Sequence, residues 1–207
     1  MKAVGFFAST VKALSLHLVT SDAKVIRILA ACTGVQALAI WCPFTLVLPP
    51  PLLNQLPLRR VSMIRLILVT TTVLHATLKP LWLSTLTHLD LSFVPSQDDI
   101  PLADMLRQLP HLTNIAQDIL TAQSSVVAAA CASYPNLRVF VIFGNDLEKS
   151  PRYSFDLRVV VVAPTFAHSQ EWDAALLGLP DFWTRAESVV DERKARAVVQ
   201  SHYSFQT

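Results

Sequence analysis

A short phrase of apolar residues recurs along the chain and constrains its fold more than any other feature. Apolar residues occupy the first, fourth and sixth positions of each copy, except that the fifth copy has Gln117 in the sixth position. The copies begin at Val11, Val35, Leu58, Leu86, Leu112, Leu137 and Leu157, which follow one another after 24, 23, 28, 26, 25 and 20 residues. These spacings lie close to the range of about 20 to 29 residues that is typical of leucine-rich repeats. We therefore predict seven short strands, one in each repeat.

The three apolar positions of each strand are expected to point into the core, and the alternating residues to line the other face of a sheet. The expected core triplets are Val11, Leu14, Leu16; Val35, Leu38, Ile40; Leu58, Val61, Met63; Leu86, Leu89, Leu91; Leu112, Ile115 with Gln117 in the third position; Leu137, Phe140, Ile142; and Leu157, Val160, Val162.

The segments between these strands carry helix signals. Ser21 and Asp22 are suited to cap a helix through Leu29, with Gly34 placed to end it. Residues 98–109 and the run after Ser124 also have helical character. A proline just before three of the strands stops the preceding helix and favours extended geometry. These prolines are Pro57, Pro110 and Pro135.

A repeated unit of strand and helix predicts an α/β fold: an irregular leucine-rich-repeat solenoid with a parallel sheet on its concave face and helices on its convex face. We assign residues 1–165 to the solenoid and residues 166–207 to a helical C-terminal cap of the same domain. The cap should contain a helix over 181–199, in which Glu192 and Arg196 are spaced to form an ion pair.

Composition excludes several classes of protein. Apolar residues make up 52% of the chain and charged residues 15%, with a net charge of +2 and no Lys/Arg run, so we expect no nucleic-acid partner. Four scattered glycines cannot build a phosphate-binding loop, so we expect no nucleotide cofactor. Three widely spaced cysteines, Cys32, Cys42 and Cys131, are typical of buried thiols in a reducing compartment. Without a recognisable secretory signal, these features predict a cytoplasmic or nuclear protein.

Two other readings stay open. Residues 61–78 are apolar enough to suggest a membrane span, although Arg65 and His75 within them argue against one. His88 and Asp90 share one face of a strand and resemble a base with its orienting carboxylate, which is the pattern of a small hydrolase. Because such pairs are common and no metal-ligand spacing accompanies them, we expect no enzyme and no metal site.

Several strand phrases resemble the leucine-rich-repeat part of F-box-type proteins, namely those of 35–41, 86–91 and 137–142. Trp172 and the segment 181–187 resemble the closing segment of a large family of such proteins in mushroom-forming fungi. The resemblance covers roughly residues 10–200. It implies substrate recognition for an SCF-type ubiquitin ligase, with the Skp adaptor as a partner only if an F-box lies upstream. No F-box pattern precedes Val11 in this sequence.

The predicted function is therefore to bind another protein through the concave face of the sheet. The candidate binding residues are Trp41, Arg60, Ile64, His88, Asp90, Asn114, Asp118 and Phe143. In the last two strands both faces are apolar, with Val139, Val141, Phe143, Val159, Val161 and Ala163 on the expected concave side. Two explanations remain: the C-terminal segment covers these strands, which we favour, or they form an exposed groove with Trp41 and Phe143 as anchors.

Overall fold

The computed structural model describes residues 3–17, 21–41, 48–63, 81–91, 109–118, 122, 124–144, 153, 155–163, 170, 172, 174 and 179–204. The chain forms two compact units, an N-terminal unit over Met1–Leu112 and a C-terminal unit over Thr113–Thr207. The boundary between them lies within the segment that the sequence assigns to the solenoid. Each unit is described by itself below.

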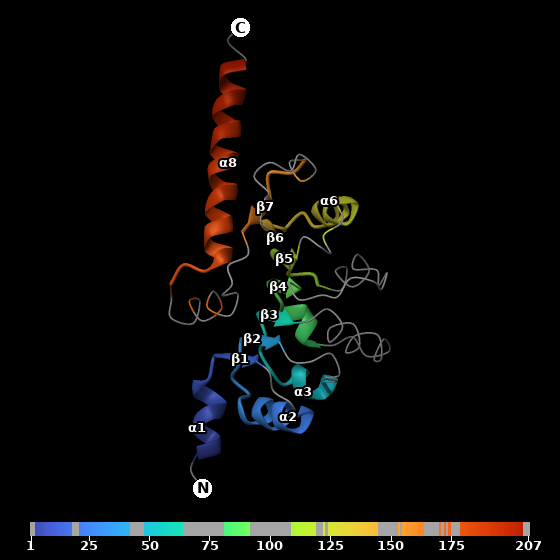
Figure 1. The fold of residues 1–207 in the computed structure, drawn as a ribbon, viewed down its shortest axis with the longest axis vertical. Coiled ribbons are helices and arrows are strands. Elements are labelled where there is room, and N and C mark those ends of the chain that lie inside the picture. Colours follow the sequence, from blue (N-terminus) through green and yellow to red (C-terminus); the bar gives the residue numbers. More distant parts are fainter. Residues whose placement is uncertain are drawn as a thin grey trace. The chain divides into compact units, whose positions relative to one another are not determined.

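The N-terminal unit alternates helices with four parallel strands, which lie side by side in chain order. Helices α2 and α3 lie together on one side of the strands (Figure 1). Its elements are α1 (Ala3–Thr10), β1 (Ala13–His17), α2 (Asp22–Ala31), β2 (Ala37–Trp41), α3 (Pro50–Asn54), β3 (Arg60–Met63), the 3₁₀ helix η1 (Leu81–Thr85) and β4 (His88–Leu91).

The repeat phrase determines how these strands pair. Leu38 lies beside Val61 in the register, and Val61 lies beside Leu89. All three side chains are fully buried. Parallel neighbours present paired residues on the same face of a sheet, so equivalent positions of successive phrases form one continuous apolar layer. The four predicted strands are confirmed here, and three of their core triplets are buried throughout. In the first triplet only Leu16 is buried, whereas Val11 and Leu14 are half-buried.

The C-terminal unit contains three parallel strands, also in chain order. Its helices lie on opposite sides of the strands (Figure 1), and α8 contacts β6 and β7. The elements are β5 (Asn114–Asp118), α6 (Ser124–Ser133), β6 (Val139–Phe143), β7 (Val159–Val162) and α8 (Phe182–Ser204). Because parallel strands alternate with helices in the described part of each unit, the α/β class is confirmed.

Helix boundaries follow the predicted caps with one exception. Ser21 is the N-cap of α2, as expected, but the helix ends at Ala31 with Cys32 as its C-cap. The prediction that Gly34 ends the helix is therefore wrong. Gly34 is instead required by space, because a Cβ atom at this position would lie 2.5 Å from the carbonyl oxygen of Ala8.

The register of the last strand differs from the prediction by one residue. Phe140 lies beside Val159, and Phe143 lies beside Val162. Val160 and Val162 therefore share the face of Phe143, where Val159 and Val161 were expected. Leu157, expected in the core, has an exposed fraction of 46%. A run of valines has no alternation of polarity, so it cannot specify which face each residue occupies.

Several other predictions fall wholly or partly outside the described residues, including the helix over 98–109. Of the apolar segment 61–78, residues 61–63 belong to strand β3 and the remainder is not described. Among the described helices, none combines the length and apolar character that crossing a membrane requires.

Candidate protein-binding face of the N-terminal unit

One face of β1–β4 collects the polar and aromatic side chains of the N-terminal unit. The register places them in rows: Ala13, Ala37, Arg60 and His88 in one row, Ser15, Ala39, Ser62 and Asp90 in the next, and His17 with Trp41 in the third. We call this surface the Trp41 face. It contains four of the candidate residues expected from the sequence, namely Trp41, Arg60, His88 and Asp90.

A chain of hydrogen bonds fixes the indole of Trp41 on this face. Its Nε1 atom donates to Ser62 Oγ at 2.8 Å, and Ser62 Oγ donates to Asp90 Oδ2 at 2.7 Å. Ser62 and Asp90 are buried, whereas Trp41 is only half-buried. The buried carboxylate therefore orients the hydroxyl, and the hydroxyl orients an aromatic ring that is still partly exposed to solvent.

His17 supports the same indole from the neighbouring strand. The two rings meet edge to face, with centroids 4.4 Å apart and planes at 72°. The Nε2 atom of His17 also lies 2.7 Å from Ser15 Oγ, and His17 is exposed. Trp41 is thus held by a hydrogen bond on one side and by an aromatic contact on the other.

Arg60 and His88 lie beside each other in adjacent strands, and both are half-buried. The Nδ1 atom of His88 is 2.8 Å from Thr87 Oγ1. Asp90 shares this strand and this face, but its carboxylate is fully buried and accepts from Ser62. The buried carboxylate therefore acts as the last acceptor in the hydrogen-bond chain from Trp41 through Ser62. Ile64 lies outside the described residues.

The candidates in the C-terminal unit are placed differently, because α8 packs on their face of the sheet. Asn114 Nδ2 donates to Glu187 Oε1 at 2.9 Å, and Arg138 forms an ion pair with the same carboxylate at 3.7 Å. Phe143 meets Phe182 edge to face at 5.0 Å and is buried. Of the two explanations for the apolar strands, the structure shows coverage by the C-terminal segment. Asp118, at the end of β5, is half-buried.

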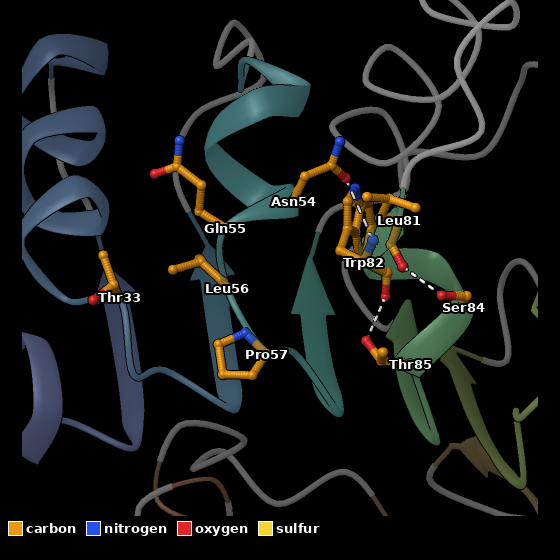
Figure 2. A pocket seen from close by; sticks show the side chains of 9 residues that line it. All are labelled: Thr33, Asn54, Gln55, Leu56, Pro57, Leu81, Trp82, Ser84 and Thr85. Carbon is orange, nitrogen blue, oxygen red and sulfur yellow. Dashed lines mark hydrogen bonds between the residues drawn. The ribbon is translucent and has the colours of Figure 1, made fainter.

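A hollow of about 500 Å³ lies beside α3 and η1 (Figure 2). Three of its polar side chains bond to the main chain. Asn54 Oδ1 accepts from the Trp82 amide at 3.4 Å, and Thr85 Oγ1 donates to the carbonyls of Leu58 and Trp82. Ser84 Oγ donates to the carbonyl of Leu81. The bonds of Asn54 and Thr85 join η1 to α3 and to the segment just before β3.

A second cluster joins buried Cys131 to half-buried Asp156 and Arg158. Burial, with a further contribution from the Asp156 carboxylate, raises the pKa of Cys131 to about 11. The hydrogen bond from Arg158 lowers the pKa of Asp156. A thiol with so high a pKa stays protonated at neutral pH and is a poor nucleophile. Nor do the described residues group three or more His, Cys, Asp or Glu side chains that could hold a metal ion.

Ser62 and His17, the two residues that hold the indole of Trp41, were not among the predicted binding residues. Ser62 occupies the alternating position between Arg60 and Ile64, so strand parity alone would have included it. His17 follows Leu16 in the first phrase and has the same parity as Ser15. Neither carries a charge or a motif that would single it out in the sequence.

The fold and this face define an α/β protein with parallel strands, helical connections and one polar, aromatic sheet face. Comparison with known proteins finds no matching family model and no matching curated protein.

Proposed function

We propose that the protein is an interaction module that binds another protein through the Trp41 face. The fixed geometry of Trp41 carries the proposal. Tryptophan is among the residues most enriched at binding hot spots, because one side chain combines a large apolar area with a directional N–H group. Here the N–H group is satisfied within the chain, so the ring is oriented before a partner arrives and binding loses less conformational entropy.

The surroundings of Trp41 fit a protein partner. Half-buried Arg60 and His88 provide polar contacts beside the ring, and small residues such as Ala37 leave room for an incoming side chain. An aromatic anchor with polar groups around it is the usual arrangement of a protein interface.

We further propose that the repeats form a leucine-rich-repeat solenoid of the F-box type, and that the protein recognises substrates for an SCF-type ubiquitin ligase in the cytoplasm or nucleus. The recurrence of the strand phrase and the resemblance of 181–187 to the closing segment of that family support this. Recruitment of the Skp adaptor would require an F-box encoded upstream.

The test of partner binding compares three versions of the 207-residue chain by quantitative affinity purification from cell extract. Trp41→Ala removes the anchor, and Leu81→Ala is the matched control, because Leu81 is 67% exposed and lies on η1. We expect specific partners to be retained by the wild type and by Leu81→Ala, and to fall at least about tenfold with Trp41→Ala. Equal recovery with all three proteins would refute the role of this face.

The ligase proposal has a separate test with purified Skp adaptor. The chain alone should not retain the adaptor, whereas a longer protein that includes the upstream coding sequence should retain it. Failure of the longer protein to bind would reject the ligase role and leave partner binding by the Trp41 face intact.

A further inference from the structure

Strand β1 leaves a row of main-chain groups directed away from its neighbour. It is the first strand in the order of the N-terminal unit and pairs with β2. The amide of Ala37 donates to the carbonyl of Lys12 at 3.1 Å, so Lys12, Leu14 and Leu16 bond toward β2. The amides and carbonyls of Ala13, Ser15 and His17 therefore point outward. Within the described part of the chain, no main-chain partner meets them.

The outward edge of β7, the last strand of the C-terminal unit, differs from that of β1. The outward carbonyls of Leu157 and Val159 accept from Arg193 Nη1 of α8, at 3.4 and 2.6 Å. The amide of Val159 donates to the carbonyl of Asp156. An arginine that occupies edge carbonyls blocks the addition of another strand. Arg193 thus occupies the edge carbonyls at the start of β7, whereas no described main-chain group meets the outward edge of β1.

The side chains of β1 include none of the residue types that usually prevent another strand from pairing with an edge. The segment Ala13–His17 contains no Lys, Glu, Asp or Pro, which are the residues that usually protect an edge. Its exposed side chain is His17, and Ala13, Leu14 and Ser15 are half-buried. Helix α1, which precedes the strand, contacts α2.

We propose that β1 pairs antiparallel with β1 of a second copy of the chain, around a two-fold axis through Ser15. In this register Ser15 faces Ser15 of the other copy, and Ala13 faces His17. All of these residues have outward amides and carbonyls, so each facing pair exchanges two hydrogen bonds. Leu14 comes to lie against Leu16 of the other copy on the apolar face, which covers its remaining exposed surface.

Pairing of β1 with β1 of a second copy is favoured over pairing with an unrelated strand, because the segment Ala13–His17 is complementary to itself. Its outward groups alternate symmetrically about Ser15, no like charges face each other, and small residues meet at the axis. An interface of five residues on each side is small, so we expect a weak dimer. The inference does not depend on the Trp41 face binding a partner.

A proline at position 15 tests the register. The Ser15 amide takes no part in pairing with β2, and proline is accepted on an edge strand when its missing N–H faces outward. Ser15→Pro should therefore fold but lose the central hydrogen bonds of the dimer, whereas Ser15→Ala keeps them. Sedimentation equilibrium of the 207-residue chains should show a dimer for the wild type and Ser15→Ala, and at least about tenfold weaker association for Ser15→Pro. A wild type that stays monomeric, or equal association of all three proteins, would overturn the proposal.

A cysteine pair provides a measurement that does not depend on how proline is tolerated. Facing residues in a hydrogen-bonded antiparallel pair have Cα atoms about 5.5 Å apart, within the range of about 4.4 to 6.8 Å for disulfides. Ser15→Cys should therefore cross-link two copies on mild oxidation, as identified by mass spectrometry of the linked peptide. In Ala13→Cys the new cysteines would lie roughly 13 Å apart along the strands and should not cross-link. Equal cross-linking of both variants, or of neither, would contradict the register.

Discussion

Arg158 and Asp156 form a forked ion pair, with Nε 2.9 Å from Oδ1 and Nη2 2.7 Å from Oδ2. The same guanidinium donates to the carbonyls of Cys131, Tyr134 and Leu137, at 2.7, 3.2 and 3.5 Å. These carbonyls lie at and just beyond the end of α6, where helical hydrogen bonding leaves acceptors unpaired. The residue that precedes β7 therefore caps α6.

Loss of this cap should destabilise the C-terminal unit. Arg158→Met removes the guanidinium donor from the three carbonyls and from the Asp156 carboxylate, which keeps the bond from the main-chain amide of residue 158. Both side chains of the ion pair are only 21% exposed. We expect the free energy of unfolding in urea to fall by about 3 kcal/mol. Arg158→Lys should recover only part of this loss, because an ammonium group lacks the planar fork.

The control for this variant is Arg196→Met. Arg196 also forms an ion pair, with Glu192 at 3.6 Å, but its side chain is 78% exposed. Ion pairs exposed to water contribute little to stability. If Arg196→Met were as damaging as Arg158→Met, general loss of positive charge would explain the effect better than loss of the cap.

The same ion pair predicts how stability depends on pH. The hydrogen bond from Arg158 lowers the pKa of Asp156 in the folded protein. The stabilisation is therefore complete above the ordinary carboxyl pKa of about 4 and is lost as the pH falls through the lower, folded value. We expect the stability difference between the wild type and Asp156→Asn, measured by urea unfolding, to shrink between about pH 6 and about pH 3. A constant difference over that range would contradict this assignment.

Much of the fold could be predicted because each strand phrase indicates both which residues face the core and where the next strand begins. Leu38 and Ile40 point into the core, while the spacing of the phrases sets strands of similar length side by side. The prediction fails in the last repeat, where consecutive valines satisfy either register equally well. There Arg158 contributes to the outcome by anchoring the chain to α6, a contact that no local pattern reveals.

The candidate site was predicted only in part, for a different reason. Strand parity places Trp41 and Asp90 on one face, but the hydrogen bonds through Ser62 depend on distances across three strands. The cover over Asn114 and Phe143 comes from α8, about forty to seventy residues further along the chain. Long-range contacts of this kind leave no periodic signal in a single sequence.

The covering of the C-terminal unit makes Phe182 a key residue. It is 1% exposed and packs against both Phe143 and Trp183. We expect Phe182→Ala to lower the free energy of unfolding by about 3 to 5 kcal/mol, through lost burial and the cavity that remains. Leu179→Ala is the control, because Leu179 lies just before the helix and is 56% exposed. Similar losses in both variants would mean that α8 is not held by the Phe182 contact.

The main chain at Gly34 lies so close to the carbonyl oxygen of Ala8 that we expect no side chain to fit there. A Cβ atom there would lie 2.5 Å from the carbonyl oxygen of Ala8, which is part of helix α1, and 3.4 Å from that of Val11. Carbon and oxygen cannot approach so closely, and main-chain atoms cannot rotate away as a flexible side chain would. Gly34→Ala should therefore displace the turn after α2 or the end of α1, and lower the free energy of unfolding by about 1 to 3 kcal/mol. The neighbouring Thr33→Ala should change thermal stability little, because Thr33 is exposed. If Gly34→Ala instead melted at the same temperature as the wild type, α1 could move away from this contact without loss of stability. The helix would then not be firmly packed there.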